Sequence, residues 1–265
     1  MFKFATIGGG HVMNQARLAG VFVIVIAIIV MAQCASLIPP SVKLESIITP
    51  VVPDGDDKYT MEEDGAISYN LEGLKISVKP MTDEKLNKMF PDISYQKEAS
   101  TNPYTYGNWI DLDLGYTPNR FTVFLVKVFN YAQPKVNLEP LNSVLTTDRG
   151  SRLFPYAREQ KDSPGNERNF ESYYERIKGS SGVERNRFEQ RLGIVRQTLF
   201  TEGQIFKGDK KEGFIVFDPL DETVKEVKLE IRDFILKYDS NNWPQQKIDI
   251  FFPFKRELKK IVEKK

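Results

Sequence analysis

The 265-residue chain carries 37 basic and 36 acidic residues, a net charge of +1 at pH 7, so its overall charge gives no electrostatic reason to bind nucleic acid. Hydrophobic residues make up 41% of the chain and include 18 Phe, which is enough for a packed core and excludes general disorder. The length suits one large domain or two small ones.

The first segment has the pattern of a secretory signal. Lys3 and Arg17 precede an apolar run over 18–32, and Cys34 follows almost at once. A positive start, an apolar stretch and small residues around a cleavage site are typical of such signals. The run of 15 residues is shorter than the roughly 20 that comfortably span a bilayer. We therefore expect residues 1–33 to be a signal peptide and the rest to work outside the cytoplasm.

The residues around the cysteine, Met31-Ala32-Gln33-Cys34, resemble the lipobox of bacterial lipoproteins. In that family the cysteine is lipidated and becomes the new N-terminus, although Gln33 stands where Gly or Ala is usual. The resemblance implies a lipid anchor at Cys34 in the inner or outer membrane, with the body in the periplasm or at the cell surface. Ordinary cleavage near Cys34 or Ala35 and an uncleaved single-pass anchor are the alternatives.

Counts of cysteine and histidine exclude several kinds of site. The only cysteine is Cys34, and the only histidine is His11, inside the expected signal. The exported part would therefore have no internal disulfide, no Cys/His zinc site, no haem histidine and no Ser-His-Asp triad. We expect a non-catalytic protein with no cofactor and no metal; carboxylate, Lys, Tyr or Ser-Lys chemistry stays open for an enzyme.

Residues 34–58 are expected to be a tether between the anchor and a folded domain. They contain four prolines and the polar turn sequence at 54–57, which break regular structure. The alternative is that residues 44–52 pack as an edge strand.

A β-rich domain is expected over residues 59–254. Apolar and polar residues alternate over 66–71 and 74–79 around Glu72-Gly73, which predicts a hairpin with one buried face. Residues 120–130 carry β-branched and aromatic residues on both faces, as in a central strand covered on both sides.

Helices and further strands follow by the same patterns. Residues 82–90 are a short helix candidate, and an insertion over 151–200 has two more, at 166–178 and 183–200, the second weakened by Gly193. Further strands are expected at 214–217, 224–236 and 248–252, and the basic stretch 255–265 is expected to be an exposed helix or a frayed tail.

Short strands separated by turns predict a mainly β fold, an antiparallel β-sandwich with a short helical insertion. The sequences at 203–208 and 212–219, with the strand before them and Asp148-Arg149-Gly150, resemble the immunoglobulin-like domains of bacterial envelope lipoproteins of unknown function. The resemblance covers residues 118–252 and implies an immunoglobulin-like sandwich with an accessory, binding or assembly role. It implies no catalytic residues, and the insertion departs from it.

Aromatic residues form the first candidate binding site. Tyr104, Tyr106 and Trp109 cluster around Pro103 and Gly107. Exposed aromatics on a loop suit binding of sugars or proteins, because a flat ring offers a large contact area at a small entropic cost. The alternative is that they pack at the rim of the core.

The insertion supplies the second candidate site, because arginine mixed with aromatics is enriched at protein interfaces. The residues concerned are Arg152, Phe154, Tyr156, Arg168, Tyr173, Tyr174 and Arg176. The alternative is that the two helices simply cap a sheet.

These observations favour a non-catalytic envelope lipoprotein that contacts another envelope protein through the insertion. A carbohydrate-binding module that uses Tyr104, Tyr106 and Trp109 is the alternative. A third hypothesis is a hydrolase that uses Asp111 and Asp113, which would share one face of a strand.

Overall fold

The computed structural model describes residues 41–162, 165 and 168–263. The expected signal peptide and Cys34 lie outside the described residues. Within the described ranges, no helix has both the length and the apolar character that crossing a membrane requires. Residues 42–261 form one compact unit, to which the following description refers.

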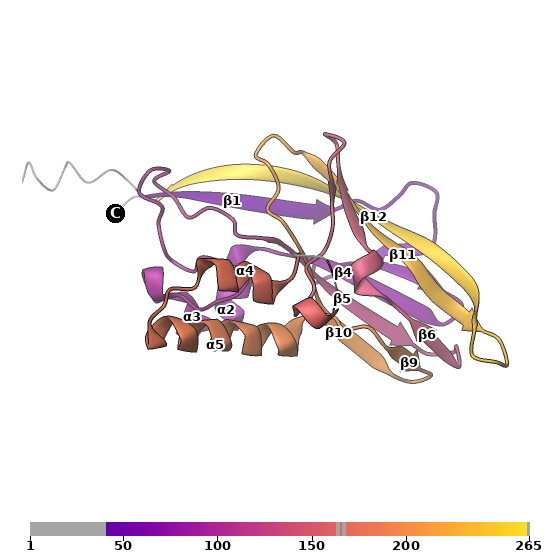
Figure 1. Cartoon of the computed structure of the whole chain (residues 1–265). Coiled ribbons are helices and arrows are strands. Elements are labelled where there is room, and N and C mark those ends of the chain that lie inside the picture. Colours follow the sequence, from indigo (N-terminus) through magenta and orange to yellow (C-terminus); the bar gives the residue numbers. More distant parts are fainter. Residues whose placement is uncertain (1–40, 163–164, 166–167, 264–265) are drawn as a thin grey trace, which may run out of the picture. The chain divides into compact units, whose positions relative to one another are not determined.

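Strands in two antiparallel sheets dominate this unit (Figure 1). The first sheet has the order β1 (Ser41–Pro50), β12 (Pro244–Glu263), β11 (Glu226–Tyr238), β6 (Lys135–Asn137) and β9 (Gln204–Phe206), with β7 (Val144–Thr147) on β11 and β8 (Arg152–Leu153) on β7. The second sheet has the order β10 (Lys210–Phe217), β5 (Thr122–Asn130), β4 (Leu74–Met81), β3 (Ile67–Leu71) and β2 (Tyr59–Met61). The mainly β prediction is confirmed.

The predicted hairpin is β3 and β4. Leu71 pairs with Leu74, and the two residues between them both have positive φ, 46° at Glu72 and 77° at Gly73. Two-residue hairpin loops favour this backbone because its twist matches that of the flanking strands. The turn therefore fixes the register that puts Ile76 on the buried face.

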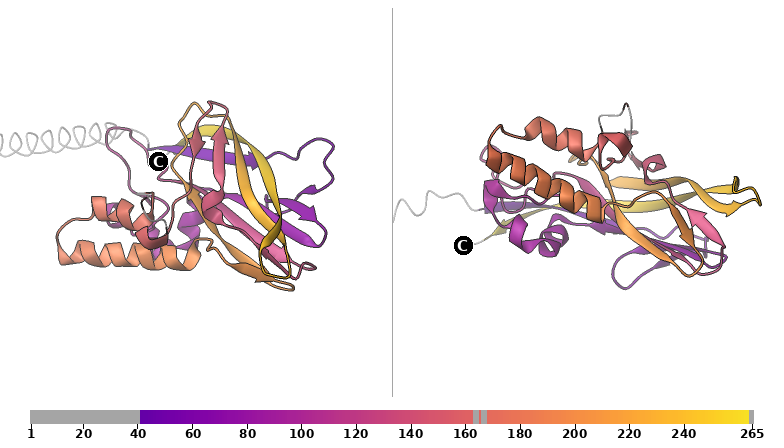
Figure 2. Two further views of the ribbon diagram at one scale, coloured as in Figure 1. Left: turned by 45° about the vertical axis from the view of Figure 1, so that its right-hand side comes forward. Right: turned by 60° about the horizontal axis from the view of Figure 1, so that its bottom comes forward.

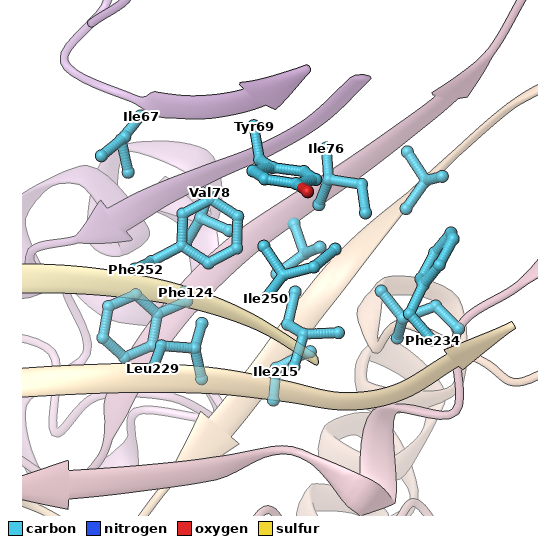
Figure 3. Packing of buried hydrophobic residues seen from close by; sticks show 14 of the residues in the cluster. Ile67, Tyr69, Ile76, Val78, Phe124, Ile215, Leu229, Phe234, Ile250 and Phe252 are labelled. Atoms are coloured by element: carbon cyan, nitrogen blue, oxygen red, sulfur yellow. The ribbon is translucent and has the colours of Figure 1, made fainter. Parts of the chain in front are cut away.

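The main hydrophobic core lies between the two sheets, whose inward side chains meet there (Figure 3). The Tyr59 ring meets Phe252 at 5.9 Å between centroids, and Phe124 meets Phe254 at 5.2 Å, so both contacts join one sheet to the other. Complete burial of each large apolar side chain contributes about 1.5–3 kcal/mol, so this cluster is a major source of stability.

The α-helices of the described residues gather beside one end of the strands (Figures 1 and 2). They are α2 (Asp83–Met89), α3 (Pro91–Ser94), α4 (Phe170–Ile177) and α5 (Gly182–Thr198). Short 3₁₀ turns occur at η1 (Lys97–Ala99), η2 (Pro140–Asn142) and η3 (Gln160–Asp162). The three predicted helices are confirmed as α2, α4 and α5, and each begins after a capping side chain: Thr82, Asn169 and Ser181.

A second hydrophobic cluster forms where these helices cover the outer face of β5 and β10. On α5, Leu192 and Val195 are 2% and 0% exposed and pack in one cluster with Val123 of β5 and Val216 of β10. Phe124, the next residue along β5, belongs to the main core instead. The prediction that the 120–130 strand is covered on both faces is confirmed.

The expected tether is wrong over residues 41–50, although residues 51–58 form turns and irregular structure as expected, and the expected helix or frayed tail is wrong over 255–263. Residues 41–50 form β1, an edge strand on β12, as the alternative for 44–52 proposed. Residues 255–263 belong to β12, because Arg256 alternates with the exposed Lys255 and Glu257 and turns inward, 7% exposed. Residues 255–263, which the sequence analysis treated as a basic tail, are therefore about half of the long strand β12.

Candidate functional site

A basic and aromatic hollow lies between η1, the loop over residues 100–120 and helix α5. Its volume is about 230 Å³. We call it the Arg120 pocket; it is lined by Lys97, Glu98, Ser100, Tyr106, Trp109, Arg120 and Arg191.

The loop that carries the aromatic residues is held by a buried polar network. The side-chain amide of Asn102 donates to Ser94 Oγ at 2.9 Å, and its oxygen accepts the Tyr104 N–H at 2.9 Å. Gly107 has a φ of 65°, and a Cβ there would lie 1.9 Å from the Ser94 carbonyl oxygen. Only glycine lets the chain pass this close, so Gly107 is what seats Tyr106 against the pocket.

Arg120 is the buried cation of the pocket, with 8% of the residue exposed. Its guanidinium carbon lies 3.9 Å from the centre of the Tyr106 ring, and its NH1 donates to the Asn102 carbonyl oxygen at 3.2 Å. A longer bond of 3.4 Å reaches the Tyr174 hydroxyl. Burial lowers the pKa of Arg120 and the facing tyrosine hydroxyls raise it, with a net increase. The guanidinium therefore stays charged.

Arg191, on α5, is the second cation, and it is half-buried. Its NH2 donates to the Ser100 carbonyl oxygen at 2.8 Å, and its guanidinium carbon lies 5.2 Å from the Tyr174 ring centre. Burial lowers the pKa of Arg191, with Arg120 among the neighbouring charges that lower it further. Tyr174 therefore contacts both positively charged guanidiniums, that of Arg120 and that of Arg191.

Neither arginine forms an ion pair with a carboxylate among the described residues, although the charge of Glu184 acts on Arg191. Carbonyl oxygens and tyrosine rings are their partners instead, and the Nε atoms of both are buried without a hydrogen-bond partner. Two cations held side by side by the fold can donate to an anion in the pocket.

Two of the three aromatic residues predicted for binding line this pocket. Tyr106 and Trp109 are both partly exposed, with ring centres 5.4 Å apart. Tyr104 is wholly buried instead, with its ring 5.1 Å from Phe214 and its hydroxyl bonded to Thr198. An exposed role for Tyr104 is therefore wrong, because the ring fills the core under the helices.

The second predicted set does not form a single surface. Arg152, Phe154 and Arg176 are exposed, while Tyr173 is half-buried and Tyr174 is 1% exposed.

Tyr156 and Arg168 do meet, at one carboxylate. The Tyr156 hydroxyl donates to Asp218 Oδ1 at 2.6 Å, and Arg168 pairs with the other oxygen of Asp218. Burial, followed by this hydrogen bond, raises the pKa of Tyr156. The aromatic residues of the insertion mainly cover the sheet.

The two arginines were missed by the sequence analysis, although Arg191 leaves a signal. It lies three residues after Phe188 and four before Val195, which places it on the buried face of α5. A cation on an apolar helix face is a candidate for a site. Arg120 has no comparable signal, because it precedes a strand and its partners come from residues 102 and 174.

Another cleft, of about 210 Å³, contains Glu139 and Glu202. Burial, followed by a hydrogen bond that the protonated Glu139 donates to Glu202, raises the pKa of Glu139 from 4.5 to about 7. The Glu139 carboxylate also accepts the Leu141 N–H at 3.1 Å as the cap of η2. Two carboxyls bonded to each other stand closer than the roughly 5 Å or more that glycoside hydrolysis needs. This geometry favours a structural cap over acid/base chemistry.

The pair Asp111 and Asp113 lies in a turn, so the expectation of a shared strand face is wrong. Asp111 Oδ1 accepts the N–H groups of Asp113 at 2.9 Å and Leu114 at 3.1 Å, which closes the turn locally. A carboxylate used in this way stabilises the loop.

Comparison with known proteins gives no family for this chain. No family model matches it. A search of curated proteins finds no match either. Among solved structures, the crystal structure of the yjhA protein from Bacillus subtilis is similar over 69% of this chain and 93% of that one, with 9% identity and a TM-score of 0.34. So low a score carries no argument about function, which has to be inferred from this chain's own geometry.

Proposed function

We propose that this chain is a non-catalytic binding protein of the bacterial cell envelope, and that it holds an anionic ligand in the Arg120 pocket. The observation that carries the proposal is the pair of guanidiniums, on Arg120 and Arg191, that line one hollow and form no ion pair with a carboxylate among the described residues. In that part of the chain Arg120 NH2 and Arg191 NH1 have no acceptor, so a ligand anion could accept from both cations.

The envelope placement rests on the leader and on Cys34. In this proposal the leader exports the chain and a lipid at Cys34 anchors it, leaving the body outside the cytoplasm. The two packed sheets would be an immunoglobulin-like sandwich that presents the pocket on its loops and on α5. Metabolic labelling with a fatty-acid analogue tests the anchor: Cys34→Ser abolishes labelling, and a variant that labels as strongly as wild type contradicts it.

Anion binding is tested by thermal unfolding of the purified body, by which we mean the chain without the expected signal peptide, residues 1–33. Phosphate, sulfate, acetate and glucuronate are compared with chloride at equal ionic strength. A ligand at one hundred times its Kd stabilises by about 2.7 kcal/mol, which for a body of this size raises Tm by roughly 5–10 °C. At least one of these anions is expected to produce such a rise.

A matched pair of variants on α5 locates the effect. Arg191→Gln removes one cation of the pocket, whereas Arg185→Gln removes the same charge from an exposed position of the same helix. The anion-dependent rise in Tm is lost in the first variant and retained in the second. If Arg191→Gln responds like wild type, the pocket is not the binding site.

A second candidate function, contact with another envelope protein, is favoured by one observation. The turn after Trp109 exposes three apolar side chains: 44% of Ile110, 94% of Leu112 and 49% of Leu114. Exposed apolar residues that gather in one loop are typical of contact surfaces. Crosslinking in cells tests this: Leu112→Asp is expected to lose a crosslinked partner that Phe154→Asp, in the insertion, retains, and retention by both variants contradicts it.

A further inference from the structure

We infer that the ligand of the Arg120 pocket is a single sugar residue that bears a carboxylate, such as a uronic acid within an envelope polysaccharide. This inference rests on the proposed anion binding and adds the chemical class of the ligand. It combines three observations: the terminal guanidinium nitrogens without an acceptor among the described residues, the tilted aromatic pair and the size of the hollow.

The guanidiniums define the anionic end of the ligand. One nitrogen of Arg120 is committed to the Asn102 carbonyl oxygen, and one of Arg191 to the Ser100 carbonyl oxygen. The other terminal nitrogens, Arg120 NH2 and Arg191 NH1, have no acceptor among the described residues, whereas the Nε atoms are buried beneath the surface. A carboxylate has two oxygens and about four acceptor positions, so it can accept from both arginines at once.

The aromatic pair, Tyr106 and Trp109, indicates where the sugar ring of the ligand would pack. Arg120 stacks on the Tyr106 ring at 3.9 Å and so covers one of its faces. Trp109, 5.4 Å from Tyr106 and partly exposed, is the ring left to act as a platform. A sugar ring packed on an aromatic face gains contact area at a small cost in side-chain entropy.

The size of the pocket and the charge at its rim limit the class of ligand further. Sites for drug-sized ligands are about 300–1,000 Å³. At about 230 Å³, and open to solvent, this hollow suits one ring of a chain that continues outside it. Glu98 at the rim repels a dianionic phosphate more than a singly charged carboxylate, and it can accept hydrogen bonds from sugar hydroxyls.

Fluorescence of Trp109 tests the inference. The chain has two tryptophans, and Trp243 is 71% exposed, so Trp243→Phe leaves Trp109 as the single reporter. The full body with this substitution is titrated with galacturonate, glucuronate, glucose, acetate and inorganic phosphate. At least one uronate is expected to change Trp109 emission saturably, at least tenfold more tightly than acetate, phosphate or glucose.

Variants tie the signal to the arginines. Arg120→Gln weakens uronate binding at least tenfold, and Arg185→Gln leaves it unchanged. Because a buried substitution can impair folding, Arg191→Gln, at a half-buried position, is measured in parallel with the same expectation.

The outcomes separate the inference from the proposed function. If phosphate or acetate binds as tightly as the uronates, the sugar inference fails while anion binding stands. If glucose binds as tightly as the uronates, the carboxylate requirement fails. If neither sulfate nor any of the five compounds binds by calorimetry, both the inference and the proposed function fail.

Discussion

Two buried arginines, Arg256 and Arg120, differ in how many hydrogen-bond acceptors the fold gives them. Arg256 is 7% exposed, and it donates to Ser46 Oγ at 2.8 Å and to the carbonyl oxygens of Val224 at 3.2 Å and Leu220 at 3.4 Å. These bonds tie β12 to β1 and to the loop before β11. Arg120 has the same degree of burial with fewer acceptors. Arg256 is thus structural, whereas Arg120 keeps donor capacity, as the proposed anion binding requires.

Replacement of Arg256 by methionine is expected to destabilise the body by about 2–4 kcal/mol. The change leaves buried carbonyl oxygens without donors, each at a cost of about 1–3 kcal/mol, partly offset by apolar burial. Urea unfolding measures the loss, and Lys255→Met, at the exposed neighbouring position, is the control and should stay within about 0.5 kcal/mol of wild type. Equal effects of the two substitutions would contradict this role.

A pH dependence of stability follows from Glu139. Its pKa rises from 4.5 to about 7 on folding, chiefly through burial. The folded state therefore holds this proton more tightly, and the stability that this provides is present below about pH 4.5 and is lost as pH rises through about 7.

Glu139→Gln removes this titration and keeps a side-chain oxygen for the Leu141 N–H. The wild type should lose stability from about pH 5 to about pH 8 and the variant should not, so the unfolding free energy of the variant minus that of the wild type is expected to increase over this range. Urea unfolding of both proteins at the two pH values measures the difference. A difference in unfolding free energy that is the same at both would show that the Glu139 carboxyl does not titrate in this window.

At the scale of elements, helix α5 combines a buried face with a position of poor helix propensity. Phe188, Leu192 and Val195 are buried, and Gly193 lies between them in sequence. A Cβ at Gly193 would meet nothing within 4 Å. Glycine in a helix interior costs up to about 1 kcal/mol relative to alanine.

Gly193→Ala is therefore expected to stabilise the body by about 0.5–1 kcal/mol, with unchanged ligand binding. Thermal or urea unfolding measures the gain. Gln197→Ala, at an exposed position of the same helix, is the control and should change stability by a few tenths of a kcal/mol at most. A loss of stability in Gly193→Ala would mean that the helix needs its glycine for packing.

Elements with a local pattern could be predicted from the sequence, whereas those that depend on distant pairing could not. The β3–β4 hairpin and α5 carry their own periodicity and turn or cap residues. The strand β1 has no partner nearby: the Val51 N–H bonds to the Pro253 carbonyl oxygen, about 200 residues later. The prolines before and after it, and the turn sequence at 54–57, therefore indicated a tether.

The site shows the same limit. Tyr106 and Trp109 could be singled out because they are close together in a loop that is rich in aromatic residues. Arg191 reaches them only because α5 packs beside that loop, which no local pattern records. The burial of Tyr104 was equally hidden, since it depends on Phe214 from β10 and Thr198 from α5.

For the whole molecule, β5 and β10 belong to both hydrophobic clusters. Phe124 and Ile215 face the main core, while Val123 and Val216 face the helices. The insertion is also bonded to β10 directly, since the Tyr156 N–H donates to the Val216 carbonyl oxygen at 2.9 Å. The helices therefore cannot separate from the sheet without exposing the outer face of β5 and β10.

Unfolding is expected to be a single cooperative transition. In the Trp243→Phe background, Trp109 fluorescence reports on the pocket side and far-ultraviolet circular dichroism reports chiefly on the sheets. The two urea midpoints should coincide, as for a two-state domain. A Trp109 midpoint clearly below that of circular dichroism would mean that the helical layer opens independently of the sheets.

The tight passage at Gly107 has a consequence for evolution. Because a Cβ there would meet the Ser94 oxygen at 1.9 Å, a descendant that acquires alanine must rebuild the loop that carries Tyr106. Lineages that keep the ancestral specificity should thus keep glycine here together with arginine thirteen positions later. Where genomes hold copies that lack this glycine, the altered copies should have diverged in what they recognise while retaining the same scaffold.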